Sequence, residues 1–287
     1  MIILDLNQVM IANLMVSIGG HKVDVDENLL RHMILNSIRY NYVKFNKEFG
    51  ELVIACDDKN YWRRNIFPYY KAGRKKSREQ SDLDWNSIFQ ALNKIRDELK
   101  EYFPYRTIQV DTAEADDIIG ALCHKYGKDL GGDPILILSG DKDFQQLQRF
   151  ANVKQYDPVR KRWIRCNDPE AFLKEHILKG DVGDGVPNFL SSDDTFVSGS
   201  RQKPLRSKTI NTIMSADWPE DWSGMTEELK RNYYRNKALI DLSAVPERIN
   251  KQVYTQFDDQ QGKGRDKLFN YFIKNKLKNL MDSISEF

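Results

Sequence analysis

Short apolar runs that end in aspartate constrain the fold of this chain more than any other feature. They are Ile2–Leu4 before Asp5, Leu52–Cys56 before Asp57, and Pro134–Leu138 before Ser-Gly-Asp141. Runs of this length and composition are typical of strands buried on both faces, as in a parallel sheet. Between them lie amphipathic stretches, including Glu27–Phe49 and Trp85–Tyr102, with apolar residues at spacings of three and four. This alternation predicts an α/β fold with a mostly parallel central sheet flanked by helices.

The alternation of strands and helices continues to about residue 180, and only helices are expected after it. Further strands are expected at Tyr105–Val110, Val153–Asp157 and Arg162–Arg165, and the last two should pair with each other around a turn at Pro158. A helix is expected at Pro169–Leu178. Gly, Ser, Asp and Pro dominate residues 181–207, and helices are expected at about 208–216, 226–240, 246–257 and 266–281. We therefore predict an α/β domain over residues 1–179 and an all-α C-terminal domain over residues 180–287.

The segment DTAEADDIIGALCHK, residues 111–125, concentrates negative charge at the start of a predicted helix. With Asp111 or Thr112 as the N-cap, Glu114, Asp116 and Asp117 fall in its first turn. One acid there would complement the helix dipole. Three acids repel one another, and a bound divalent cation is the usual partner of such crowded carboxylates.

The strand-end aspartates should join these acids, because the carboxyl ends of parallel strands share one edge of a sheet. Each aspartate alone could be a capping or turn residue. Independent caps have no reason to share one edge, and a cluster of oxygen ligands favours Mg²⁺ or Mn²⁺ over zinc. The predicted metal ligands are Asp5, Asp57, Glu114, Asp116, Asp117, Asp141, Asp143, Asp181 and Asp184, the last two in the loop KGDVGDG.

Such a cluster suits hydrolysis of a phosphodiester. Two divalent ions about 3.5–4 Å apart activate a water molecule and stabilise the leaving oxygen. No Ser/His/Asp or Cys/His arrangement stands out in the sequence, and we interpret His124 as a packing or surface residue. Asp116 and Asp141 are the acids predicted to be catalytic.

A basic arch segment, residues 60–82, follows Asp57 directly and interleaves aromatic rings with cations. Rings that stack on bases and cations that neutralise phosphates are typical of single-strand binding, although a solvated basic loop is the common alternative. Lys71 and Arg74 would point the same way from one helical turn, toward the scissile phosphate, and are predicted to be catalytic. The predicted nucleic-acid contacts are Trp62, Arg63, Arg64, Tyr69, Tyr70, Lys71, Arg74, Lys75 and Lys76, together with Arg201, Lys203, Arg206 and Lys208.

Charge and cysteine usage agree with a nucleic-acid enzyme of a reducing compartment. Lys plus Arg is 44 and Asp plus Glu is 42, but several acids gather at the predicted site while basic residues gather at 63–78, 160–165 and 201–208, so a nearly neutral chain can still present basic faces to a polyanion. Three cysteines without a CxxC pair argue against a disulfide framework and a zinc site. The start MIILDLNQVM is neither a signal peptide nor a membrane span, so we expect a cytoplasmic protein.

Taken in order, these motifs resemble those of the 5′-nuclease family, also called flap endonucleases. The matching segments are L-D-L at Asp5, A-C-D at Asp57, Y-Y-K-x-x-R at Lys71 and Arg74, E-A-D-D at 114–117, S-G-D-K-D at Asp141 and Asp143, and G-D-x-x-D at Asp181 and Asp184. YWRR at 61–64, LKGD at 178–181 and the closing SISEF are most similar to the ribonuclease H branch of T-even-type phages.

The resemblance implies a PIN-like nuclease fold with a helical arch and a helix–three-turn–helix-like element in the C-terminal domain. It implies an enzyme that degrades RNA or DNA from the 5′ end of a duplex, cuts 5′ flaps, and removes RNA primers during lagging-strand replication in the host cytoplasm. Two Mg²⁺ ions, replaceable by Mn²⁺, are implied. Their ligands would be Asp5, Asp57, Glu114 and Asp116 for the first, and Asp141, Asp143, Asp181 and Asp184 for the second, with Asp117 beside them. Gly185 and the insert 188–206 depart from the family pattern, which leaves its monovalent-ion site without a match.

Two other functions stay open at this point. A PIN-like endoribonuclease without an arch would cleave free single-stranded RNA, and a non-catalytic DNA-binding replisome scaffold would have no use for so many acids. The tail LMDSISEF ends in an exposed-looking aromatic that could dock a sliding clamp or a single-strand-binding protein, although a simple helix end explains it equally well. We expect a monomer that binds DNA and RNA–DNA hybrids with 5′ ends or flaps.

Overall fold

A single six-stranded sheet organises the protein. The computed structural model describes residues 1–18, 26–216 and 222–287. The strand order is β3-β2-β1-β4-β5-β6, and all neighbours are parallel except β5 and β6. The mostly parallel sheet and the final antiparallel pair are therefore confirmed. The strands are β1 (Ile2–Asp5), β2 (Leu52–Ala55), β3 (Arg106–Ile108), β4 (Ile135–Leu138), β5 (Val153–Asp157) and β6 (Arg162–Ile164).

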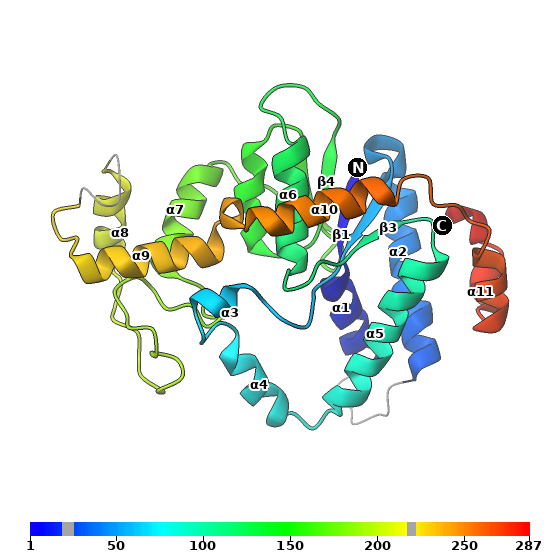
Figure 1. Ribbon diagram of the computed structural model, residues 1–287, viewed down its shortest axis with the longest axis horizontal. Helices are drawn as coiled ribbons and strands as arrows, with labels where there is room; N and C mark the ends of the chain where they lie inside the picture. Colours follow the sequence, from blue (N-terminus) through cyan, green and yellow to red (C-terminus); the bar gives the residue numbers. More distant parts are fainter. Residues whose placement is uncertain (19–25, 217–221) are drawn as a thin grey trace.

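Helices cover both faces of the sheet, which is why its central strands are apolar throughout. Ile2 and Leu4 of β1 point into one core and Ile3 into the other. The first core is covered by α1 (Leu6–Ile18), α2 (Glu27–Phe49), α5 (Trp85–Tyr102) and α11 (Leu268–Lys274). The second core is covered by α6 (Ala115–Tyr126), the 3-10 helix η1 (Lys142–Arg149) and α10 (Glu247–Asp259), and α10 runs across α6 in Figure 1.

A third core lies beside the sheet. It is built from α7 (Pro169–Lys179), α8 (Ser207–Met214) and α9 (Glu227–Ile240), and Phe67 and Tyr70 of the arch segment pack into it. After α9 the chain returns through the 3-10 helix η3 (Leu242–Ala244) and α10 to the second core. The division into domains at residue 180 stays a prediction.

The arch segment contains two short helices, α3 (Arg63–Ile66) and α4 (Ala72–Glu79). In Figure 1 the chain from α3 through α4 to α5 forms an open arc on the side of the sheet where α1 lies. The base of the arc is packed rather than exposed, because Trp62, Phe67 and Tyr70 are buried. The base of this segment is therefore part of the packed interior.

Two helices differ from the expectation. The sequence pattern does not predict α1, because apolar residues occur all round it, with Met15 and Val16 exposed and Leu14 and Ile18 buried. The helix expected over residues 266–281 is broken into α11 and α12 (Lys278–Met281), and Lys276 between them has a positive φ of 54°. None of the helices in the described ranges has the length and apolar composition needed to cross a membrane.

The C-terminal residue is an anchor of the first core. Phe287, expected to be exposed, is 0% exposed, and its ring lies 5.7 Å from Phe103 and 5.3 Å from Phe272 between centroids. The last turn before it is the short 3-10 helix η4 (Ile284–Glu286), and Arg39 of α2 forms an ion pair with Glu286. The tail thus serves the fold, and the docking role expected for its aromatic end is contradicted by this burial.

Removing this anchor should destabilise the protein. Phe287→Ala is expected to lower the free energy of unfolding by about 3 kcal/mol, because it leaves a cavity among aromatic rings. The measurement is urea unfolding followed by tryptophan fluorescence. Phe269→Ala on α11 is the matched control, since that ring is 55% exposed, and should change stability by less than about 0.5 kcal/mol. Equal effects of the two substitutions would contradict the burial of Phe287.

Candidate active site

The strand-end aspartates meet at one edge of the sheet, as predicted. Asp5 is the last residue of β1, Asp57 follows β2, and Asp141 follows β4, and β2, β1 and β4 are neighbours. Burial raises the pKa of Asp5 to about 7, and repulsion from Asp57 and Asp141 adds to the effect. Ser139 Oγ and the backbone amide of Gln8 donate to Asp5, each at 3.1 Å, and fix its carboxylate.

The start of α6 adds two more carboxylates, but its N-cap differs from the expectation. Glu114 is the cap, in place of Asp111 or Thr112, and Asp117 closes a reciprocal capping box by accepting from the Glu114 amide at 2.8 Å. Thr112 lies in the left-handed region with a φ of 64°. Burial raises the pKa of Asp116 well above its ordinary range, with repulsion from Asp141 as the next cause.

Asp117 belongs to the interior and not to the metal-binding group. Its side chain is fully buried, its Oδ1 pairs with Arg63 Nη2 at 2.8 Å, and its Oδ2 accepts from Trp62 Nε1 at 3.0 Å. Both oxygens are therefore taken by the chain itself. The structure contradicts the prediction that Asp117 is a metal ligand, because the adjacent acids Asp116 and Asp117 point to different sides of α6.

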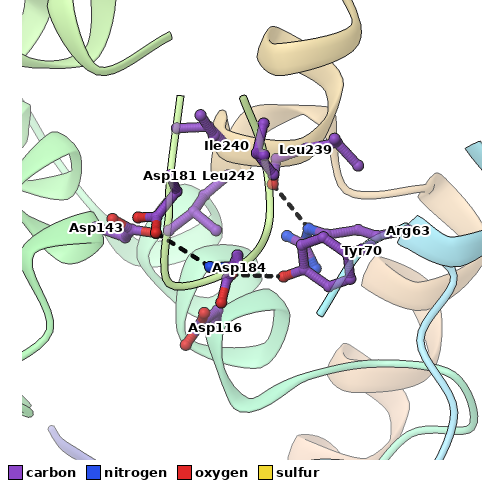
Figure 2. A pocket seen from close by; sticks show the side chains of 10 residues that line it. Arg63, Tyr70, Asp116, Asp143, Asp181, Asp184, Leu239, Ile240 and Leu242 are labelled. Carbon is purple, nitrogen blue, oxygen red and sulfur yellow. Dashed lines mark hydrogen bonds between the residues drawn. The ribbon is translucent and has the colours of Figure 1, made fainter. Parts of the chain in front are cut away.

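The second group of acids comes from the segment after β4 and the loop after α7. Asp141 caps η1 by accepting from the Asp143 amide at 2.9 Å, and its pKa is raised to about 6 by burial and by Asp143. Burial also raises the pKa of Asp184, although Lys71 and Arg74 oppose it. Figure 2 shows Asp116, Asp143, Asp181 and Asp184 directed toward one small cavity.

These carboxylates form one group, which we call the acid cluster. Its first half contains Asp5, Asp57, Glu114 and Asp116, and its second half contains Asp141, Asp143, Asp181 and Asp184. Electrostatic repulsion links the two halves through the pairs Asp5 with Asp141, Asp116 with Asp141, and Glu114 with Asp184. Of the nine predicted metal ligands only Asp117 falls outside it. The acid cluster consists of Asp5, Asp57, Glu114, Asp116, Asp141, Asp143, Asp181 and Asp184.

The base of the arch segment touches the acid cluster through its cations. Lys71 Nζ lies 3.5 Å from Asp184 Oδ2, and Arg74 Nη2 lies 2.6 Å from Asp184 Oδ1. The prediction that Lys71 and Arg74 point the same way is confirmed. Lys71 also pairs with Glu114, which accepts from Arg63 at 2.8 Å and from the Tyr70 hydroxyl at 2.9 Å. Burial would raise the pKa of Glu114, but Lys71 and Arg63 outweigh it and hold that pKa below its usual range.

Glycine at position 185 allows the loop 181–186 to meet the arch segment. Gly185 has a φ of 74°, and a Cβ there would lie 3.2 Å from the carbonyl oxygen of Tyr69. The Lys71 amide donates to the Asp184 carbonyl at 2.7 Å, and Asp181 and Val186 pair as an antiparallel bridge. The two segments that carry Lys71 and Asp184 are therefore fixed relative to each other by backbone hydrogen bonds.

Besides Lys71, three of the predicted nucleic-acid contacts are buried. Arg63 is 2% exposed, stacks on Trp62 at 4.7 Å and pairs with two acids of α6, and the buried Tyr70 donates its hydroxyl to Asp184. No base could stack on Trp62 or Tyr70 in this state, so the expectation of exposed rings is wrong for both. Rings and cations interleave here because they build a buried cation–π and ion-pair network.

The other predicted contacts lie on the surface. Arg74 is 48% exposed beyond its bond to Asp184. At the start of the insert, α9 holds the backbone in place, since Arg235 and Asn236 donate to the Pro187 carbonyl at 3.0 and 2.9 Å. The exposed predicted contacts are Arg64, Tyr69, Arg74, Lys75, Lys76, Arg201, Lys203, Arg206 and Lys208.

Asn7 and His176 are polar residues of the site that were not predicted. Asn7 donates from Nδ2 to Asp57, and His176 Nε2 lies 2.9 Å from Asp143 Oδ1. Asn7 comes two residues after Asp5 and could have been found by its place at the start of α1. His176 lies on α7, five residues before Asp181, and that spacing alone carries no signal for a shared site.

Known proteins share both halves of this chain. A family model described as the 5′-3′ exonuclease N-terminal resolvase-like domain matches residues 30–176, and one described as T4 RNase H, C terminal, matches residues 168–287. Ribonuclease H of Enterobacteria phage T4 is 35% identical over 99% of this chain and 95% of that protein. Flap endonuclease Xni of Shewanella sp. (strain MR-4) is 30% identical over 47% of this chain and 50% of that protein.

A solved structure shares the fold. The bacteriophage T5 flap endonuclease, crystallised as a pseudo-enzyme–product complex with DNA and metal ions, superposes with a TM-score of 0.65. The match covers 91% of this chain and 98% of that one at 16% identity. With its acid cluster at the carboxyl edge of the sheet and both family models matched in succession, the chain belongs to the 5′–3′ exonuclease family, in the branch that carries the T4 RNase H C-terminal domain.

Proposed function

We propose that the protein is a metal-dependent 5′→3′ exonuclease and 5′-flap endonuclease that acts on DNA–DNA and RNA–DNA duplexes. The observation that carries this proposal is the acid cluster, in which acids at or just after the ends of β1, β2 and β4, at the start of α6, on η1 and in the loop after α7 meet at the sheet edge. Phage T4 ribonuclease H and the Xni flap endonucleases, to which the chain is similar, bear names of such nucleases. We infer that the protein removes RNA primers during lagging-strand replication.

The residues present fit divalent cations. Burial raises the pKa values of Asp5, Asp57, Asp116, Asp141 and Asp184, and neighbouring carboxylates raise them further, so this site disfavours the ionised carboxylates unless a cation is bound. Hard cations with oxygen ligands, Mg²⁺ first and Mn²⁺ in its place, would compensate their charge. We assign one ion to Asp5, Asp57, Glu114 and Asp116 and a second to Asp141, Asp143, Asp181 and Asp184. Bound there, two such ions would activate water and stabilise the leaving oxygen.

Lys71 and Arg74 would hold the scissile phosphate over the acid cluster. Both already direct their donors to Asp184 from the arch side, and Arg74 is half exposed. A phosphate diester brought to this point would receive charge-assisted hydrogen bonds from the same groups, which become stronger as charge develops on its oxygens. The exposed cations of α4 and of the insert would bind the flanking phosphates.

A role in replication carries further expectations. We propose that the protein works as a monomer in the host cytoplasm, on DNA and RNA–DNA hybrids with 5′ ends or flaps. Contacts with a sliding clamp or a single-strand-binding protein are proposed from the replication role alone, because Phe287, the aromatic residue expected to make them, is buried.

One set of substrates tests the function. Flap, nicked and RNA–DNA hybrid duplexes, each labelled at the 5′ or the 3′ end, are incubated with and without Mg²⁺. We expect release from the 5′ end and cutting at the flap junction in Mg²⁺, and no product when EDTA removes the metal. Cleavage of free single-stranded RNA without need of a 5′ end would favour the endoribonuclease, and binding without metal-dependent cleavage would favour the scaffold.

Metal binding should release protons in a defined pH range. A carboxyl group whose pKa is raised by folding keeps its proton to a higher pH in the folded protein than in the unfolded chain. The free energy of unfolding of the metal-free protein therefore falls as the pH rises through the folded-state pKa. A cation binds the ionised form and displaces that proton. With Asp141 at about 6 and Asp5 at about 7, Mg²⁺ binding should release more protons at about pH 6 than at about pH 8.5.

Calorimetry in two buffers of different ionisation enthalpy measures this release directly. Asp5→Asn should reduce the number of protons released at about pH 6, whereas Asp111→Asn, an exposed acid outside the acid cluster, should leave it unchanged. Proton release that is the same at both pH values would contradict the raised pKa values.

A further inference from the structure

The second half of the acid cluster contains an imidazole to which the proposed function gives no role. His176 lies on α7 with only 7% of its surface exposed. Its Nε2 is 2.9 Å from Asp143 Oδ1 and 3.5 Å from Asp181 Oδ2. The three side chains come from η1, α7 and the loop after α7, and one ligand atom from each lies within 4.8 Å of the others.

These distances are those of neighbouring ligands around one cation. An octahedral ion with bonds of about 2.1 Å places adjacent ligand atoms about 3.0 Å apart. Both measured separations lie near this value, so a cation would need little movement of Asp143, His176 and Asp181. The ring is also held in place, because Phe172, one turn earlier on α7, packs against it at 5.7 Å between centroids.

The surrounding charges favour a cation at this point. Asp141 repels Asp143 across the start of η1, and Asp184 and Asp181 contribute further negative charge. The opposing group is Lys142, whose Nζ lies 2.9 Å from Asp181 Oδ2. Lys142 is 53% exposed, so its side chain can turn to solvent when an ion takes its place.

We propose that His176 is a ligand of the second metal position, together with Asp143 and Asp181. This inference rests on the proposed function, whose second ion it locates on the α7 side of the acid cluster. A nitrogen ligand changes which metal is preferred. Mg²⁺ favours oxygen donors, whereas a mixed nitrogen and oxygen set favours a transition cation such as Mn²⁺. The second position is therefore selective for Mn²⁺ over Mg²⁺, and the all-oxygen first position is not.

Electron spin-echo spectroscopy of the Mn²⁺-loaded protein tests this assignment. A directly bound imidazole gives ¹⁴N modulation of the Mn²⁺ signal, and a histidine that only donates a hydrogen bond to Asp143 does not. We expect the modulation in the wild-type protein and in H124Q, whose histidine lies on α6 beside Arg149, and its loss in H176Q. Titration should show that H176Q weakens Mn²⁺ binding at one position by about tenfold or more and Mg²⁺ binding by a smaller factor.

The outcomes separate the two proposals. Mn²⁺ bound to the wild type without ¹⁴N modulation would overturn the role of His176 and leave the nuclease proposal intact. Failure of the wild type to bind Mn²⁺ at all would overturn both. If H176Q does not fold, the variant with H21Q, H32Q and H124Q keeps His176 as its one histidine. Modulation in that variant supports the assignment, and its absence refutes it.

Discussion

Asp141→Asn should reduce cleavage of a 5′-flap substrate in Mg²⁺ by about 100- to 1000-fold, and Asp116→Asn should do the same. Each substitution removes one carboxylate from the point where the two halves of the acid cluster repel each other. Loss of a ligand charge weakens the stabilisation that a metal ion gives to the reacting phosphate, which is worth several kcal/mol. The measurement is single-turnover cleavage of an end-labelled flap at saturating enzyme.

The same variants should fold normally, which separates this result from a loss of structure. Burial and repulsion disfavour the ionised form of both residues, so a neutral amide relieves that repulsion in the metal-free protein. Asp141→Asn should also keep the cap on η1, because an amide oxygen at this position can still accept from the Asp143 amide. The unfolding free energy without metal should therefore stay equal or rise. Asp111→Asn is the control for cleavage, and full turnover by both cluster variants would refute the role of the cluster.

Arg63→Met should lower the free energy of unfolding by about 3–5 kcal/mol. Arg63 is the buried cation that pairs with Glu114 and Asp117 on α6 and donates to the Leu239 carbonyl at the end of α9. Without it, Asp117 loses its cation in the interior and Glu114 keeps Lys71 but loses its second cation, and an uncompensated buried charge is strongly destabilising. The measurement is urea unfolding at neutral pH, with the midpoint compared at constant slope.

The neighbouring arginine provides the matched control. Arg64 is exposed, so Arg64→Met should change stability by less than about 0.5 kcal/mol, and it should weaken duplex binding if it contacts phosphate. Similar small losses of stability in both variants would contradict the buried network. Because the Arg63 network joins α3, α6 and α9, its loss should also loosen the base of the arch segment.

The sheet and most of the acid cluster could be predicted because their signals are local. A buried parallel strand needs a continuous apolar run, and the end of that run places Asp5, Asp57 or Asp141 at the carboxyl edge. Neither inference requires knowledge of a distant partner. The strand order follows less directly, yet the convergence of the acids holds for any order in which these strands are neighbours.

The roles of Asp117, Arg63 and Trp62 could not be predicted, since they depend on partners far away in the sequence. Rings and cations in alternation suit a nucleic-acid surface and a buried ion-pair network equally well. What decides between them is that α6 and α9 pack against α3 and enclose the guanidinium. Adjacent acids on a helix also diverge by about 100°, so one enters the acid cluster and the other the interior.

The roles of Phe287 and His176 could not be predicted for the same reason, because they also depend on partners that are distant in the sequence. A terminal aromatic has the same local pattern whether it is free or packed, and only its contact with Phe103 and Phe272 places it in the core. The distance of His176 from Asp143 depends on how α7 lies against η1, which the spacing of residues does not express.

Anomalous diffraction from crystals soaked in Mn²⁺ tests the central claim most directly. The account predicts two peaks inside the acid cluster, one bounded by Asp5, Asp57 and Asp116, and one bounded by Asp141, Asp143 and Asp181. Peaks confined to other parts of the surface, or no peak at saturating Mn²⁺, would contradict the claim that these carboxylates converge to hold the metal ions of a nuclease.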